Sequence, residues 1–83
     1  MNIRQLEYFL EVSKQESFSK AAAILHVSQP SVSEMVKNLE EELGTPLLYR
    51  GAKRLELTDA GQIVQEQAEQ IVSLFNNLAG NLK

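Results

Sequence analysis

The sequence predicts a mainly helical domain that carries one short β-hairpin and ends in a long helix. Apolar residues recur at spacings of three and four in four segments, which is typical of amphipathic helices. Between the third and fourth segments lies a stretch in which apolar and polar residues alternate around a Gly, as in a hairpin. At 83 residues the chain buries only about 60% of its unfolded surface, so we expect one small domain that gains stability from a partner.

The first helix is predicted at residues 3–13. Ile3, Leu6 and Phe9 share one of its faces, and Asn2 is a suitable N-cap. The repeat fades after this segment, in a polar stretch that ends before the next apolar residues.

The second helix is predicted at residues 18–26, with Ser17 as N-cap. Three successive alanines make it slim, so it can pack closely on its neighbours. His26 falls where this helix has to stop, and neither Gly nor Pro is present there. Because His is enriched among non-Gly residues in left-handed conformations, His26 is predicted to form the corner and to turn Val27 inward.

The third helix is predicted at residues 28–43, with Ser28 as N-cap and Gly44 after its last residue. Its opposite, exposed side begins with small hydroxyls, an amide and a proline, although Glu, Lys and Ala are better helix formers. Such groups present hydrogen-bonding edges and short apolar surface, so we interpret this helix start as a reading head. The buried face is predicted to consist of Val32, Met35, Val36, Leu39 and Leu43.

A hairpin is predicted at residues 48–57, where Gly51 supplies the turn and Lys53 and Arg54 make the tip basic. Two helices joined by a tight turn and followed by a basic hairpin occur in the order of a winged helix-turn-helix. In that arrangement the third helix enters the DNA major groove. The hairpin cations meet the DNA backbone or the minor groove.

The last helix is predicted at residues 59–83 after the N-cap Thr58, and it divides the chain into a body at residues 1–58 and a terminal helix. Its apolar residues are spaced 4, 3, 4, 3 and 4, as in a coiled-coil seam. A helix this apolar is not stable alone in water, so the seam predicts a homodimer. The predicted seam residues are Val64, Ala68, Ile71, Phe75, Leu78 and Leu82.

The side chains of the reading head match the edges of DNA bases. The Gln29 amide can pair with N6 and N7 of adenine, and Pro30 can contact a thymine methyl group. Ser33 can reach a base or a phosphate, and Lys37 a phosphate or a guanine. The expected partner is therefore double-stranded DNA.

The net charge opposes this interpretation when it is averaged over the surface. The chain has 8 Lys and Arg against 11 Asp and Glu, a formal charge of −3. However, screening limits the reach of charges to about 8 Å at physiological salt, so cations gathered near one face still attract phosphate. A helical interaction module that dimerises through its last helix and binds protein is the alternative, favoured by the net acidity.

The composition argues against several other classes. One His, one Asp and no Cys make a poor acid–base or nucleophile set, so we expect no enzyme, no metal site and no cofactor. No apolar run is long enough for a signal peptide or a membrane span, and no Cys is available for disulfides. These features predict a soluble, cytoplasmic protein.

The chain also resembles the N-terminal DNA-binding domain of the bacterial LysR-type transcriptional regulators. The segments "SFSKAAAILHVSQPSVS", "LEEELGTPLLYR" and "LTDAG" occur in the order and spacing of that family, and the resemblance covers nearly the whole chain. It implies a winged helix-turn-helix followed by a linker helix that pairs two subunits. It also implies that any small-molecule effector acts through a larger domain that these residues do not include.

The resemblance assigns roles to individual residues. It implies wing contacts for Lys53 and Arg54, and a phosphate contact for Arg4. Glu34 stands where the family often has Arg; its carboxylate either repels phosphate or accepts from N4 of cytosine. Arg50 is open between a structural partner for the glutamates at residues 40–42 and a DNA ligand. Base or backbone contacts are implied for Ser28, Gln29, Pro30, Ser31, Ser33 and Lys37.

Overall fold

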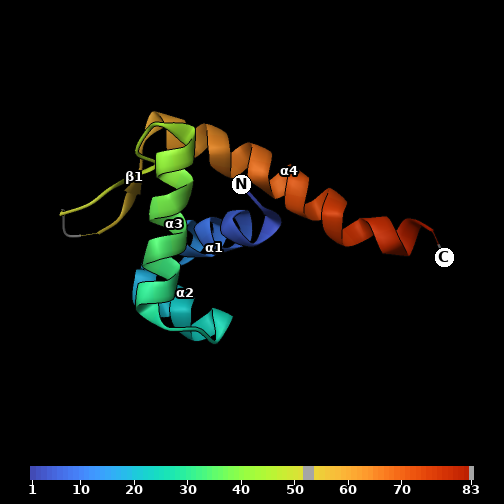
Figure 1. Cartoon of the computed structure of the whole chain (residues 1–83), viewed down its shortest axis with the longest axis horizontal. Coiled ribbons are helices and arrows are strands. Elements are labelled where there is room, and N and C mark those ends of the chain that lie inside the picture. The colour runs from blue at the N-terminus through green and yellow to red at the C-terminus, as the bar shows by residue number, and fades with distance from the viewer. Residues whose placement is uncertain (52–53, 83) are drawn as a thin grey trace.

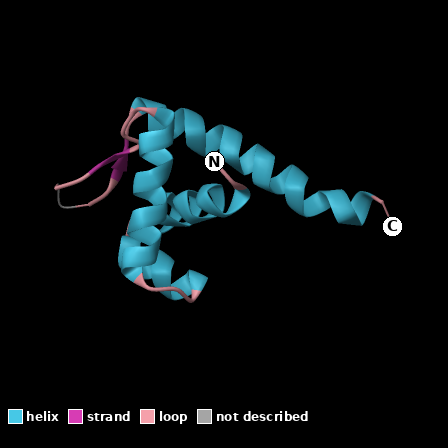
Figure 2. Ribbon diagram, viewed as in Figure 1, coloured by secondary structure: helices cyan, strands magenta, loops and turns pink. Residues whose placement is uncertain are grey.

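The computed structural model describes residues 1–51 and 54–82, and the predicted mainly helical architecture is confirmed within them (Figures 1 and 2). Helix α3 stands next to the hairpin, and α1 lies between α3 and α4. Within these residues no helix is both long and apolar enough to cross a bilayer. In chain order the elements are α1 (Ile3–Gln15), α2 (Phe18–Leu25), α3 (Gln29–Leu43), β1 (Leu48–Tyr49), β2 (Glu56–Leu57) and α4 (Asp59–Asn81).

Helix α1 begins at the predicted N-cap but runs two residues further than expected. The Asn2 side chain accepts from the backbone N–H of Gln5, and the Gln5 side chain accepts from the N–H of Asn2, which forms a capping box. The last turn is held by the Gln15 amide, which donates to Glu11 at 2.8 Å. This i,i+4 pair stabilises a turn that apolar periodicity alone does not predict.

The corner between α2 and α3 forms at His26, as predicted. His26 has φ 58° and ψ 41°, and the N–H of Val27 donates to the Ala22 carbonyl at 3.1 Å. Val27 packs against the core. Ser28 then caps α3 by accepting from the N–H of Ser31 at 3.2 Å.

The core lies where α1, α2 and α3 meet. Ala21 and Ala22 are buried, so α2 approaches its neighbours closely, as the sequence predicted. Val32, Val36 and Leu39 of α3 are fully buried, whereas Leu43 in its last turn is 38% exposed and extends the apolar face beyond the core.

Each strand of the hairpin has two residues. They pair antiparallel with Leu48 opposite Leu57 and Tyr49 opposite Glu56. Toward the tip, Gly51 turns the chain with φ 90°. At the other end the N–H of Leu47 donates to a side chain of α3 instead of a strand, which ends the ladder.

Helix α4 uses its apolar stripe in two ways. Its first half packs on α1 and β2, with Ala68 buried and Val64 and Val72 half-buried against the core. Its second half projects beyond the body (Figure 1). The predicted seam is therefore divided, because Val64 and Ala68 already contact their own chain. The exposed seam residues are Ile71, Phe75, Leu78 and Leu82.

Candidate nucleic-acid interface

The start of α3 gathers most of the predicted reading residues on one exposed surface. Its apolar face is turned into the core, which leaves the opposite side free. The hydroxyls of Ser28 and Ser31 lie 2.8 Å apart, so the N-cap hydrogen bond also orients the Ser31 side chain. The exposed residues on this surface are Ser28, Gln29, Pro30, Ser31, Ser33, Glu34 and Lys37.

Two shallow grooves flank the exposed side of α3. One is lined by Pro30, Ser33 and Lys37. The other brings Arg4 of α1 beside Ser31 and Glu34. Glu34 lines both grooves, so it lies beside Arg4 in one groove and beside Ser33 and Lys37 in the other. Asn38 also lines both grooves and was not among the predicted ligands.

The hairpin cation Arg54 lies apart from α3. It is 73% exposed along its side chain, and its Nε is 3.9 Å from a carboxylate oxygen of Glu16, at the end of α1. An exposed ion pair of this length contributes little to stability, so Arg54 is free to exchange this partner for another anion. The predicted wing residue Lys53 lies outside the described residues.

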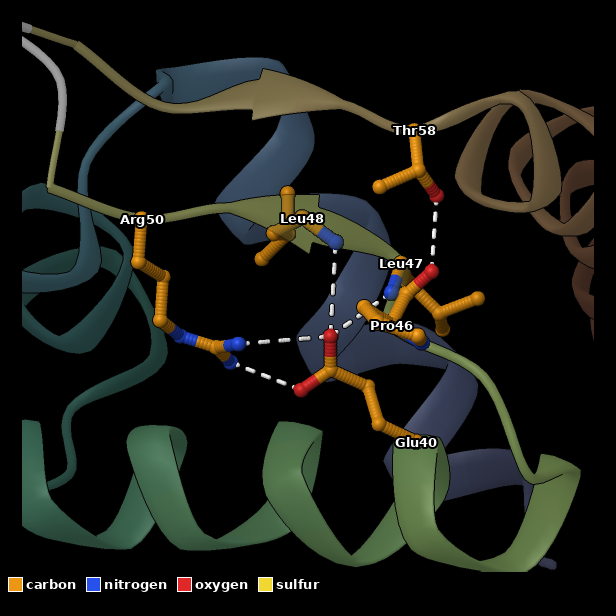
Figure 3. Close-up of polar contacts among 6 residues, drawn as sticks. All are labelled: Glu40, Pro46, Leu47, Leu48, Arg50 and Thr58. Atoms are coloured by element: carbon orange, nitrogen blue, oxygen red, sulfur yellow. Dashed lines mark hydrogen bonds and ion pairs between the residues drawn. The ribbon is translucent and has the colours of Figure 1, made fainter.

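Arg50 is engaged by the body of the domain. Its guanidinium donates to both carboxylate oxygens of Glu40, at 2.8 and 3.3 Å (Figure 3). It also lies 5.7 Å from the centre of the Phe18 ring. Of the two open interpretations, these contacts favour the partner of a nearby glutamate. Arg50 thereby connects β1 with α3 and α2.

Glu40 is one of the glutamates named as candidate partners of Arg50, but its burial and its contacts with the backbone were not predicted. It is 9% exposed, and one of its oxygens also accepts the N–H groups of Leu47 and Leu48 at 2.7 and 3.3 Å. Burial alone raises the pKa of Glu40, but the hydrogen bonds from Arg50 and from these N–H groups hold it below its ordinary value of 4.5. A signal was present, because a Glu four residues after Val36 and next to Leu39 continues the buried face of α3.

A helix pair with a tight turn, an exposed second helix and a β-hairpin wing define the chain as a winged helix-turn-helix domain. The model of the bacterial regulatory helix-turn-helix proteins of the lysR family matches residues 3–62. The chain therefore belongs to the lysR family.

Its relatives are transcriptional regulators. The HTH-type transcriptional regulator YwbI of Bacillus subtilis (strain 168) is 58% identical over 57 residues, which cover 69% of this chain and 19% of YwbI. The HTH-type transcriptional regulator BudR of Klebsiella aerogenes is 45% identical over 74 residues, which cover 89% of this chain and 52% of BudR. The chain thus spans about a fifth of the first and half of the second.

Solved structures with this fold include DNA complexes. The BenM DBD/catB site 1 DNA complex superimposes with a TM-score of 0.95 at 36% identity and covers 99% of this chain and 92% of that one. Full-length CbnR complexed with its target DNA gives a TM-score of 0.92 at 38% identity, over 98% of this chain and 28% of that one.

The buried carboxylate generates a prediction for stability. Glu40→Gln should lower the free energy of unfolding by about 1–3 kcal/mol at pH 7, because an amide cannot accept from all of these donors. Since the folded pKa lies below 4.5, the stabilisation by the carboxylate is complete above about pH 4.5 and is lost as the pH falls through the folded pKa. The difference between the wild type and Glu40→Gln should therefore narrow in urea titrations as the pH is lowered toward 3.

Glu41→Gln is the matched control, because it removes the same charge from an exposed neighbour. It should change stability by less than about 0.5 kcal/mol. Equal losses in both variants would show that the contacts of Glu40 contribute nothing beyond net charge.

Proposed function

We propose that this chain is the DNA-binding part of a transcriptional regulator and that it reads double-stranded DNA with α3 in the major groove. The observation that carries the proposal is the exposed, polar start of α3, whose apolar side is held in the core. The family of the chain and the DNA complexes among similar structures support the same geometry. In this docking the N-terminal residues of the helix reach the base edges.

Within the reading head, Gln29 is the main base reader. It is the first residue of α3, and its amide is both donor and acceptor, as N7 and N6 of adenine require. Pro30 contacts a thymine methyl group, and Ser28, Ser31 and Ser33 bind bases or backbone. Lys37 binds a phosphate or a guanine. Glu34 selects cytosine by accepting from N4, or disfavours a close phosphate.

Cations on two other elements hold the DNA backbone. Arg4 lies beside the reading head, across the groove that Ser31 lines, and binds a phosphate there. Arg54 leaves Glu16 and binds the backbone or the minor groove, together with Lys53. Because the chain carries a net charge of −3, these contacts act locally and the affinity for random DNA is low.

Two chains pair through the second half of α4 to form a homodimer. Phe75, Leu78 and Ile71 are 58%, 60% and 46% exposed in the single chain, next to Leu74 at 71%. Leaving each large apolar side chain in water costs roughly 1.5–3 kcal/mol compared with burial. A second copy of the same helix covers this stripe and places two reading heads on the DNA. In this assembly residues 1–58 form the reading body and residues 59–83 the linker helix.

A helical protein-interaction module is the second candidate, because the net charge is negative. The two functions differ in their salt dependence on random duplex DNA. We expect the logarithm of the association constant to fall with the logarithm of the salt concentration with a slope of about −3.6 or steeper, since four or more neutralised phosphates each contribute roughly −0.9. A fluorescence anisotropy titration at several salt concentrations measures the slope, and an absence of binding at low salt would favour the interaction module.

Gln29→Ala should weaken binding to the preferred operator by about 1–3 kcal/mol, the range for a bidentate amide–adenine pair. Binding to scrambled DNA and the thermal stability should barely change, because the side chain is exposed. The operator is obtained beforehand by selecting bound sequences from a random duplex library. Gln70→Ala removes an exposed amide from α4 instead and should leave both affinities unchanged. Equal losses on operator and scrambled DNA for Gln29→Ala would reject base reading.

The wild-type chain should sediment as a dimer at micromolar concentration, and Phe75→Asp should sediment as a monomer, because the change places a charge in the exposed stripe. Ser73→Asp adds the same charge on the other side of α4, two residues away, and should remain dimeric. A wild-type chain that stays monomeric with α4 fully helical would contradict pairing through this stripe.

A further inference from the structure

The backbone of one residue, Leu47, contacts both α3 and the N-cap of α4; Figure 3 shows its contact with Glu40 of α3. Its N–H donates to the Glu40 carboxylate of α3 at 2.7 Å. Its carbonyl accepts from the backbone N–H of Thr58, the N-cap of α4, at 3.0 Å. Because Leu47 is fully buried, both hydrogen bonds are shielded from water. The end of α3 and the start of α4 are therefore fixed on opposite sides of the same residue.

Thr58 and Gly61 hold the first turn of α4 on this segment. The Thr58 hydroxyl donates to the Pro46 carbonyl at 2.7 Å and accepts from the N–H of Gly61 at 2.9 Å. A Cβ atom on Gly61 would lie 2.0 Å from the Leu47 carbonyl oxygen, so only glycine allows α4 to lie this close. Together these contacts fix the direction in which α4 leaves the body.

We propose that this junction, defined as Glu40, Pro46, Leu47, Thr58 and Gly61, sets the spacing of the two half-sites that the dimer reads. Thr58 and Gly61 act as positioning residues that touch no DNA. The inference rests on the proposed function, since it requires α3 to read DNA and α4 to pair the two chains. It adds that spacing specificity comes from the angle between these helices.

The start of α3 lies far enough from the junction for a small change in the angle between α3 and α4 to alter the half-site spacing. The start of α3 lies about 16 Å along the helix from Glu40, at 1.5 Å per residue. A change of about 10° at the junction then moves each reading head by about 3 Å. Over two chains this amounts to roughly 6 Å, nearly two base-pair steps of about 3.4 Å each. A loosened junction accepts several spacings, and an intact one accepts a single spacing.

The test compares Thr58→Val with Thr58→Ser in the 83-residue chain. Valine removes the hydroxyl that contacts Pro46 and Gly61 but keeps the N–H that donates to Leu47, whereas serine keeps both groups. The probes are duplexes with two copies of the half-site that the wild type selects from a random library, with the spacing varied one base pair at a time. A duplex with a single half-site measures reading alone, and circular dichroism checks that α4 remains helical.

We expect the wild type and Thr58→Ser to prefer one spacing by about tenfold over spacings two base pairs away, because half-site separation must match the geometry of the dimer. Thr58→Val should reduce this preference at least threefold, with its single-site affinity within twofold of the wild type. Ser17→Ala removes a comparable N-cap from α2 and should keep the wild-type preference.

Two results overturn the inference. The first is a folded Thr58→Val with the wild-type spacing preference. The second is a loss of affinity in Thr58→Val that is equal at every spacing and on the single half-site.

Gly61→Ala provides an independent second variant, because its methyl group must displace α4 from the Leu47 carbonyl, and it should shift or broaden the preferred spacing. A wild type that binds no duplex overturns the proposed function itself and is distinguishable, since no selected half-site would then exist.

Discussion

The buried carboxylate of Glu40 is the constraint on which the arrangement of the other elements depends. An ionised group with little access to water is tolerated only when its oxygens are paired, and its four donors all come from the segment that follows α3. That segment must therefore turn back over the end of α3 as soon as it leaves Gly44. The N–H groups of Leu47 and Leu48 start the hairpin there, and Arg50 extends the connection to the Phe18 ring of α2. A single side chain thus fixes the origin of the wing.

This arrangement keeps the two ends of α3 separate in function. The C-terminal end is occupied by structural contacts, with Glu40 inward and the loop of residues 45–47 beside it (Figure 3). At the N-terminal end Val32 is buried in the core, while the polar side carries the Ser28 cap and remains exposed. Because α4 begins on Leu47, the surface proposed for dimerisation also originates at the structural end. The reading head is consequently the part of α3 that carries the fewest contacts needed for folding.

The local features of this fold could be predicted from the sequence. The contacts between residues that are far apart in the sequence could not. The caps at Asn2, Ser28 and Thr58 and the left-handed corner at His26 depend on neighbouring residues, so residue type and position suffice to predict them. Periodicity predicted the burial of Val32, Val36 and Leu39 on α3, but not the exposure of Leu43 or the burial of Glu40.

The apolar repeat of α4 shows the limit of this reasoning. Its spacing predicts a continuous stripe, but periodicity does not specify which surface covers the stripe. The structure places Ala68 against the body of the same chain and leaves Phe75 exposed. Gly61 is similar: a glycine inside a predicted helix indicates a close approach, but only the folded chain identifies the Leu47 carbonyl as the neighbour. Of the candidate site, the sequence therefore predicted the exposed polar residues at the start of α3 and missed the buried contacts that hold the neighbouring elements.

The distribution of charge over the domain affects nonspecific and specific DNA binding differently. Glu41 and Glu42 lie near the end of α3, about 18 Å along the helix from Gln29 at 1.5 Å per residue, which is more than two Debye lengths of about 8 Å at physiological salt. Their repulsion is therefore largely screened at Gln29, whereas Glu41 lines the same groove as Lys37 and repels phosphates that approach the end of α3. Nonspecific binding depends on phosphate contacts from any face, whereas specific binding depends on base contacts from one. An acidic body with local cations beside α3 thus weakens nonspecific binding more than operator binding. It thereby increases the ratio of operator affinity to nonspecific affinity, which determines how fully a site in a genome is occupied.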